Sequence, residues 1–178
     1  CGFCVSFWDL SRTHSSENAF EATESDIVLT DEPFKAALYG LRDVKNTHEI
    51  AAMKYASLVS AEAIRRTMKL VKPGFYEYTL EAILTSCWLE HGLHAWGYPP
   101  IIGSGVRSAF LHYNKNNGKV CDGDLVLIDA GGELQGYTSD ITRTFPANGK
   151  FSDTQKQIYE AVLFIQTALV AALKPGAE

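Results

Sequence analysis

The chain has 178 residues, of which 46% are hydrophobic and 21% charged, a composition that is typical of a globular domain with its own core. Its formal net charge of -5 offers no basic surface, so a nucleic-acid partner is excluded. The chain contains no run of about 18 apolar residues, so neither a membrane span nor a membrane partner is expected.

Residues 1–40 show little regular pattern. The chain begins with a cysteine rather than a methionine, and residues 11–25 are mostly polar. We therefore expect a piece of a longer protein, in which residues 1–40 are the tail of an N-terminal domain and a linker.

The four cysteines predict ordinary thiols. Cys1 and Cys4 form a C-x-x-C pair, but a zinc site needs a second pair, and Cys87 and Cys121 lie far apart in the sequence. Scattered cysteines are typical of a reducing compartment, which favours a cytoplasmic location.

Two helices are predicted next. Asn46 with Glu49 three residues later matches a capping box, and apolar residues recur at helical spacing until Lys72-Pro73-Gly74. The second helix ends at Gly92. It carries one apolar face made of Leu80, Ile83, Leu84 and Cys87.

Short strands and a third helix follow. The strand-like segments are 101–105, 109–113, 125–128 and 141–145. Ser152 and Gln155 match a second capping box. The helix after them carries Ile158, Val162, Ile165 and Leu169 on one side. This order predicts an α+β fold with helices packed on one face of an antiparallel sheet.

Two aspartates stand out in the strand region. Asp129 ends one apolar run and Asp140 opens the next, and three glycines lie between them. A hairpin centred near Leu134-Gln135 places the two aspartates directly opposite each other, with Cβ atoms about 4.5–5.5 Å apart. Two catalytic metal ions lie about 3.5–4 Å apart, so this spacing predicts half of a two-metal site.

A single aspartate at a strand end often bonds only nearby backbone in a turn. Two carboxylates that face each other repel, however, unless a cation lies between them. The pair therefore favours a metal site over two turn residues.

Two further residues are candidates for the same site. Thr142 shares the strand face of Asp140 and can support a ligating carboxylate; the alternative is an exposed β-branched strand residue. His112 ends an apolar run and can donate a hydrogen bond to a substrate carbonyl or oxyanion. The alternative is a half-buried histidine with a backbone partner.

Together these motifs resemble a known family. Residues 103–105, 110–113, 128–133 and 139–146 are similar to the Xaa-Pro peptidases of the pita-bread metallopeptidase family, which are prolidase (Xaa-Pro dipeptidase) and aminopeptidase P. The likeness covers residues 41–178. It implies the first half of a pita-bread (creatinase/aminopeptidase) fold, that is, the N-terminal half of a catalytic domain with helices on one face of a curved antiparallel sheet.

The resemblance also implies roles for the candidate residues. Asp129 binds one divalent ion, Asp140 bridges two, and His112 assists substrate and transition-state binding. The ions are usually Mn²⁺, with Co²⁺ or Zn²⁺ as alternatives, and they activate the water that attacks the bond before proline. The implied partners are proline-containing dipeptides or short peptides, and a second copy of the chain in a homodimer.

The sequence leaves three candidate functions. The leading one is an Xaa-Pro dipeptidase, and the nearest alternative is an Xaa-Pro aminopeptidase, which accepts longer peptides. The alternative from another class is a non-catalytic pita-bread binding module, although relatives of that kind usually lose the metal aspartates. The family also uses a histidine and two glutamates further along the chain as ligands, and no matching motif occurs here. We therefore expect this chain alone to bind metal poorly and to be inactive.

Overall fold

The computed structural model describes residues 31–177. The chain divides into two compact units, Cys1–Val44 and Lys45–Glu178. In the first unit, helix α1 spans Asp31–Asp43. The interpretation of Cys1 and Cys4 lies outside the described residues, as does that of most of the predicted tail. The assignment of residues 41–178 to half of a catalytic domain stays a prediction.

Helix α2, which spans Thr47–Leu70, begins with the predicted capping box. The side chain of Asn46 accepts hydrogen bonds from the backbone N–H groups of His48 and Glu49. The carboxylate of Glu49 accepts in return from the backbone N–H of Asn46. These bonds satisfy N–H groups that the first turn of a helix otherwise leaves unpaired, so the predicted helix start is confirmed.

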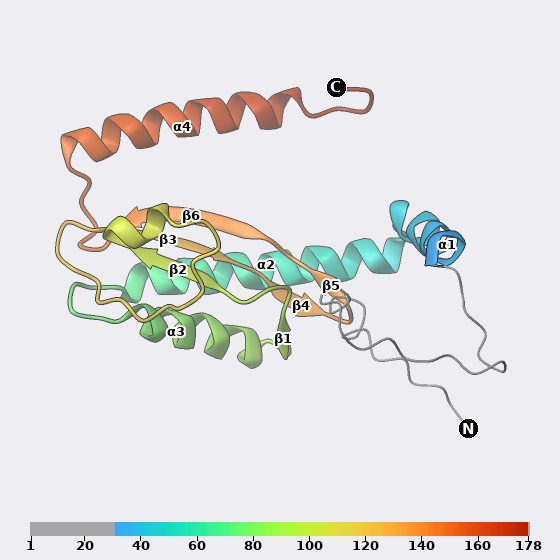
Figure 1. Cartoon of the computed structure of the whole chain (residues 1–178), viewed down its shortest axis with the longest axis horizontal. Helices are drawn as coiled ribbons and strands as arrows, with labels where there is room; N and C mark the ends of the chain where they lie inside the picture. Colours follow the sequence, from blue (N-terminus) through green and yellow to red (C-terminus); the bar gives the residue numbers. More distant parts are fainter. Residues whose placement is uncertain (1–30, 178) are drawn as a thin grey trace, which may run out of the picture. The chain divides into compact units, whose positions relative to one another are not determined.

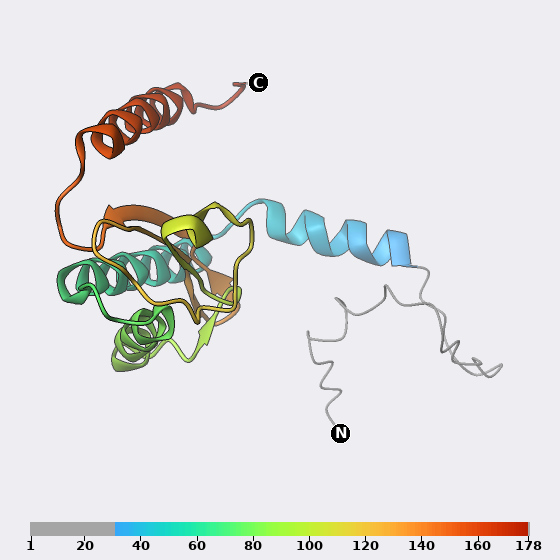
Figure 2. The same ribbon diagram turned by 60° about the vertical axis from the view of Figure 1, so that its left-hand side comes forward.

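Helix α3 spans Glu77–Glu90 and packs against α2, as Figures 1 and 2 show. The predicted apolar face is confirmed, because Leu80, Leu84 and Cys87 are buried and Ile83 packs against the core. The chain turns away after the helix at Gly92, whose φ of 79° is easily adopted by glycine.

Six strands form two antiparallel sheets of three strands each. The first sheet has the order β1 (Ala95–Trp96), β4 (Gly132–Leu134) and β5 (Tyr137–Thr138). The second has the order β2 (Ile101–Ser104), β3 (Leu125–Ala130) and β6 (Ile141–Pro146). Helix α2 contacts β4, β5 and β6, and α3 contacts β2. The predicted α+β arrangement is therefore confirmed for these two helices.

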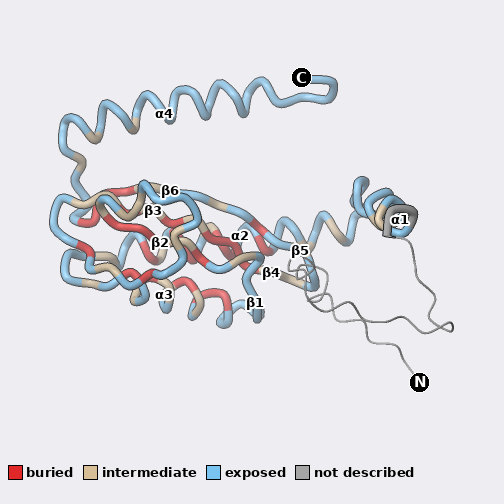
Figure 3. The backbone as a smooth tube through the Cα atoms, in the orientation of Figure 1, coloured by how far each residue is buried: buried red, intermediate tan, exposed pale blue. Residues whose placement is uncertain are grey.

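The core lies between these helices and one face of the second sheet. Val126, Ile128 and Ala130 of β3 are fully buried, whereas the residues between them are partly exposed. This period of two is typical of a strand with one face on the core. Figure 3 shows the buried residues gathered where the strands meet α2 and α3. Asp129 is one of the partly exposed residues, so it belongs to the face that these helices leave open.

The predicted hairpin register is wrong. The turn is centred one residue later than predicted, which changes the partner of each paired residue by two positions. Leu134 pairs with Tyr137, and the two central residues, Gln135 and Gly136, have φ values of 54° and 83°. A two-residue turn with both φ values positive matches the right-handed twist of the strands. Glycine adopts such a φ at no steric cost, so Gly136 fixes the centre of the turn one residue later than predicted. Asp129 therefore lies opposite Thr142, not opposite Asp140.

The predicted strand at 109–113 is also wrong. A 3₁₀ helix, η2, spans Gly105–Ala109, and the chain turns after it with no strand before Leu125 except an isolated bridge at Lys119. The apolar residues Phe110 and Leu111 are 61% and 89% exposed, so their apolar character does not reflect burial in a sheet. His112 has a φ of 53°.

Helix α4 spans Asp153–Ala172 and begins with the predicted capping box of Ser152 and Gln155. None of its residues is buried, as the colours of Figure 3 show. The side chains of the predicted stripe are 57% to 63% exposed: Ile158, Val162, Ile165 and Leu169. Periodicity thus predicted the helix correctly, but no other described part of the chain covers its apolar stripe. Within the described range, none of the helices combines the length and hydropathy that crossing a bilayer requires.

Candidate functional site

The two aspartates lie on the same face of the sheet despite the shifted register. Asp129 pairs with Thr142 of β6, and Asp140 stands two residues before Thr142. Residues two apart in extended backbone share a face, so Asp129 and Asp140 are diagonal neighbours, for which the separation is about 7–8 Å. Opposed positions are therefore not needed to bring the two carboxylates together.

A tyrosine hydroxyl joins the two carboxylates. Tyr98 Oη lies 2.5 Å from Asp129 Oδ1 and 2.9 Å from Asp140 Oδ1. A phenol has one proton and can donate it fully to one acceptor at a time, so the two carboxylates share a single donor. Asp129 is partly exposed and Asp140 is exposed, so both side chains are accessible from solvent. The two predicted site residues therefore lie close enough for both carboxylates to contact one hydroxyl group.

The environment of Tyr98 favours its neutral form. Burial and the hydrogen bonds to Asp129 and Asp140 raise the pKa of Tyr98 above its ordinary value, because each makes a negative phenolate less favourable. The hydroxyl therefore stays a donor at neutral pH. The sequence analysis missed this residue, because its acceptors lie 31 and 42 positions away along the chain. Neither Gly97 nor Pro99 beside it indicates such a partner.

The turn that carries Asp140 is anchored to α2 by buried serines. Ser60 of α2 accepts hydrogen bonds from the backbone N–H of Gly132 at 2.9 Å and from the Ser139 hydroxyl at 2.8 Å. Both serines are buried. A Cβ added to Gly131 would lie 1.6 Å from the Ser139 carbonyl oxygen, so only glycine allows this approach. The position of Asp140 is therefore fixed by the residues directly beside it.

Thr142 lies where the strand alternation predicts. It is the register partner of Asp129, on the same face, and it is exposed. In the described part of the chain no hydrogen bond joins its hydroxyl to either carboxylate. The structure thus gives Thr142 a position beside the site, and a supporting role for its hydroxyl stays a prediction.

His112 lies on a different segment from the aspartates, in the turn that follows η2. Its side chain is exposed and its backbone is left-handed, which costs free energy for any residue with a Cβ. Among residues 31–177 no hydrogen bond or ion pair links His112 to Asp129 or Asp140. The structure therefore brings the two aspartates together but shows no direct contact from the histidine.

The donor set fits a hard divalent ion in part. Carboxylate oxygens are the ligands that Mn²⁺ prefers, and two of them converge here on one point. No group of three or more histidine, cysteine, aspartate or glutamate side chains in the described residues could hold a metal ion. The described residues thus offer two converging carboxylates, which is fewer ligands than a complete metal site has.

Comparison with known proteins shows the family of the chain. Residues 51–178 match the family described as metallopeptidase family M24. The chain is 41% identical over 143 residues to the Xaa-Pro aminopeptidase of Escherichia coli strain K12, covering 80% of this chain and 32% of that protein. It is 43% identical over 140 residues to the human Xaa-Pro dipeptidase, covering 76% of this chain and 28% of that protein.

The solved structure of proline aminopeptidase P II from Yersinia pestis gives the same result for the fold. It superposes with a TM-score of 0.79 at 40% identity, over 80% of this chain and 33% of that one. The chain thus spans about a third of the length of the relatives it matches. Its α+β arrangement is part of the pita-bread aminopeptidase fold. On sequence and structure together, the chain belongs to metallopeptidase family M24.

Proposed function

We propose that the chain supplies the two-aspartate part of a dinuclear metal site that hydrolyses the peptide bond before proline, with Asp129 and Asp140 as metal ligands. One observation carries the proposal: both carboxylates lie within hydrogen-bond distance of the same tyrosine hydroxyl. Carboxylates held this close are stabilised when a cation neutralises them. Relatives that share about 40% of its residues are Xaa-Pro peptidases of both kinds.

Mn²⁺ suits these hard oxygen ligands, and Co²⁺ and Zn²⁺ are the alternatives. When bound, such ions polarise the scissile carbonyl and make a water molecule nucleophilic at neutral pH. The role of the protein is to hold the carboxylates at fixed positions. The buried contacts of Ser60 with Gly132 and Ser139 do this beside Asp140, and the β3 ladder does it for Asp129.

Three other residues have roles around the two ligands. Tyr98 donates a hydrogen bond that the two carboxylates share, and so orients them. Thr142 borders the site on the same face, where its hydroxyl can support a ligand carboxylate. His112, on an exposed turn, donates a hydrogen bond to the substrate carbonyl or to the oxyanion that forms from it.

Proline explains why a dedicated site is needed. It has no backbone N–H and a fixed φ, so peptidases that grip that N–H cleave the bond before it poorly. We propose that the substrate is an Xaa-Pro dipeptide, which makes the parent activity that of a prolidase. The alternative substrate is a longer peptide with proline in second position. The similarity to an aminopeptidase P structure supports this alternative.

A domain graft tests the proposal with this chain's own residues. Residues 51–178 would replace the matching segment of the E. coli Xaa-Pro aminopeptidase, which supplies the remainder of the catalytic domain. We expect the graft to cleave Xaa-Pro peptides in the presence of Mn²⁺ and to lose at least about 100-fold in kcat/KM with Asp129→Asn or Asp140→Asn. The 178-residue chain alone, given Mn²⁺ and Ala-Pro, should release no proline.

The control for the graft is Asp153→Asn, which removes an exposed carboxylate in the first turn of α4. It should leave the rate unchanged. A folded graft whose activity survives both Asp129→Asn and Asp140→Asn would contradict the proposed ligands. The ratio of rates on Ala-Pro and on Ala-Pro-Ala, measured with the full-length parent protein, separates the dipeptidase from the aminopeptidase.

A further inference from the structure

A buried carboxylate lies under the segment that carries His112. Glu77 is the first residue of α3, and its side chain has no exposed surface. A carboxylate in such a place loses its hydration, so it must find donors within the protein. The start of a helix offers partial positive charge, which is favourable but leaves most of the lone pairs unpaired. The donors that complete the set come from residues 104–118.

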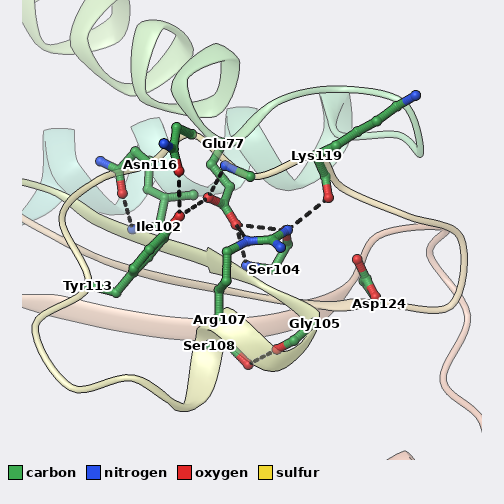
Figure 4. A network of polar contacts seen from close by, with 12 residues as sticks. Glu77, Ile102, Ser104, Gly105, Arg107, Ser108, Tyr113, Asn116, Lys119 and Asp124 are labelled. Carbon is green, nitrogen blue, oxygen red and sulfur yellow. Dashed lines mark hydrogen bonds and ion pairs between the residues drawn. The ribbon is translucent and has the colours of Figure 1, made fainter.

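Five donors converge on Glu77, as Figure 4 shows for most of them. Oε1 accepts from the backbone N–H and the hydroxyl of Ser104, both at 2.8 Å, and from Arg107 Nε at 2.7 Å. Oε2 accepts from the Tyr113 hydroxyl at 2.8 Å and from the backbone N–H of Gly118 at 2.7 Å. The donors thus come from the start, the middle and the end of one segment.

Arg107 closes the segment from the other side. Its Nη2 donates to Ser104 Oγ at 2.7 Å and to the carbonyl oxygen of Lys119 at 2.9 Å. A Cβ on Gly118 would lie 1.9 Å from Arg107 Nε, so the backbone at Gly118 packs directly on the guanidinium. One cation therefore ties the two ends of the segment together above the Glu77 carboxylate.

Asn116 provides a second attachment. Its Oδ1 accepts from the backbone N–H of Ile102 at 2.9 Å. Its Nδ2 donates to Glu81 Oε2 and to the carbonyl oxygen of Pro100, each at 2.8 Å. Asn116 is buried and has a φ of 46°, a conformation that asparagine tolerates better than most residues. The segment is therefore fixed to both β2 and α3.

His112 stands directly before Tyr113 in this segment. Its side chain is exposed, and its φ of 53° persists only if the surrounding contacts hold the backbone. The nearest such contacts along the chain are made by the Tyr113 hydroxyl, which lies 2.8 Å from Glu77 Oε2 and 3.1 Å from Asn117 Oδ1. We infer that Glu77 is a positioning residue, which fixes residues 105–118 and so sets the place of His112. This inference rests on the proposed function, in which His112 contacts the substrate.

The inference predicts a local effect of Glu77→Gln. An amide cannot accept from the five donors as the carboxylate does, and it leaves Arg107 without its ion pair. In amide hydrogen exchange of the 178-residue chain, we expect the amides of Ile102 and Phe110 to exchange at least about tenfold faster. Neither amide bonds to Glu77, so they report on the segment. Amides of β3 should change by less than about twofold.

A second readout reports on His112 itself. Its backbone chemical shifts and its N–H to Hα coupling depend on φ, and both should move towards values for a negative φ in Glu77→Gln. A loss of overall stability without a change in the native segment would not produce this shift. The matched control is Glu90→Gln, which removes a carboxylate from the same helix that pairs instead with Arg66. It should leave both readouts unchanged.

Tyr113→Phe decides the question if Glu77→Gln does not fold. It removes one hydroxyl beside His112, while the side chain stays half-buried at the same place. We expect the same selective exchange and the same shift at His112, each smaller than in Glu77→Gln. Uniformly faster exchange throughout the chain would overturn the inference, as would an unchanged segment.

Metal binding separates this inference from the proposed function. Glu77→Gln and Tyr113→Phe should bind Mn²⁺ as the wild-type chain does, because Asp129 and Asp140 lie outside the segment that these changes loosen. If the exchange result holds but a folded graft of residues 51–178 keeps its activity in Asp129→Asn and Asp140→Asn, the proposed function fails while the role of Glu77 in fixing the segment stands. If Mn²⁺ binds but the segment does not respond, this inference alone fails.

Discussion

Tyr98 is the residue through which the two site aspartates meet, so its hydroxyl makes the most direct prediction at the scale of single residues. Tyr98→Phe leaves two carboxylates close together without their shared donor. Without metal, we expect a loss of about 1.5–3 kcal/mol in the free energy of unfolding, measured by urea denaturation. Added Mn²⁺ should reduce that loss, because a cation takes over the neutralisation of the carboxylates.

The control for this change is Tyr78→Phe, whose ring stacks on Tyr76 at a centroid distance of 5.0 Å. It removes an equivalent hydroxyl from a side chain that is 53% exposed, and it should change the stability little. A Tyr98→Phe chain as stable as the wild type without metal would contradict the account of the shared donor.

Glu77 predicts how stability depends on pH. Burial raises its pKa, but hydrogen bonds from Arg107, Ser104, Tyr113 and Gly118 lower it by more, so the pKa lies below the ordinary value. The Glu77 carboxylate therefore binds a proton more readily in the unfolded state than in the folded state. The stabilisation that the ionised carboxylate gives to the folded state is complete above the unfolded pKa of about 4.3, and it is lost as pH falls through the lower folded pKa. The stability difference between wild type and Glu77→Gln should be constant above about pH 5 and shrink below it.

Gly131 predicts a steric effect next to Asp140. Because an added Cβ would overlap the Ser139 carbonyl oxygen, Gly131→Ala must push β4 and the β5–β6 connection apart. We expect a loss of at least about 2 kcal/mol in the free energy of unfolding, measured by thermal denaturation. Gly40→Ala in α1 is the control, because a Cβ there meets nothing within 4 Å. Equal stability of the two variants would show that the strands tolerate the approach.

The sequence identified some of these residues and not others, for a physical reason. Asp129 and Asp140 stand at the ends of apolar runs around a glycine-rich turn, which is a local pattern. Tyr98 and Glu77 act through partners between 27 and 42 positions away. Their roles depend on how the elements pack, which no local pattern contains.

At the scale of elements, the two capping boxes have the same chemistry in different surroundings. Asn46 caps α2, which supplies much of the core, whereas Ser152 caps α4, which has no buried residue. Asn46→Ala should lower the global stability by about 1 kcal/mol. Ser152→Ala should instead speed amide exchange in the first turns of α4 and leave the global stability nearly unchanged.

Urea denaturation and amide exchange on the same two variants check this contrast. If Ser152→Ala lowered the global stability as much as Asn46→Ala does, α4 would be coupled to the core, contrary to the exposure of its side chains.

The same elements show how far sequence predicts the fold. Both helix starts were predicted correctly, because a capping box is made by residues three apart. The hairpin was predicted one residue early, because the positive φ at Gln135 was not foreseen. The 109–113 segment was predicted as a strand because it contains a short run of apolar residues, which is typical of a strand. In the structure it is a turn, and contacts of Glu77 and Arg107 lie on either side of it in the sequence.

At the scale of the whole molecule, the chain belongs to metallopeptidase family M24 and matches part of the length of its relatives. It spans about a third of the relatives that it matches, and its described residues bring together two carboxylates rather than a full ligand set. The apolar stripe of α4 is exposed over its whole length. These features agree with the proposal that Asp129 and Asp140 are two ligands of a metal site that requires further residues.

The most direct test of the central claim is a titration of the 178-residue chain with Mn²⁺. Binding is measured by calorimetry and by the electron paramagnetic resonance signal of the free ion. We predict weak, saturable binding that falls at least about tenfold in Asp129→Asn and in Asp140→Asn, and that is unchanged in Asp153→Asn. Binding of equal strength in the wild type and in a folded chain lacking both carboxylates would contradict the claim that these two aspartates hold the metal.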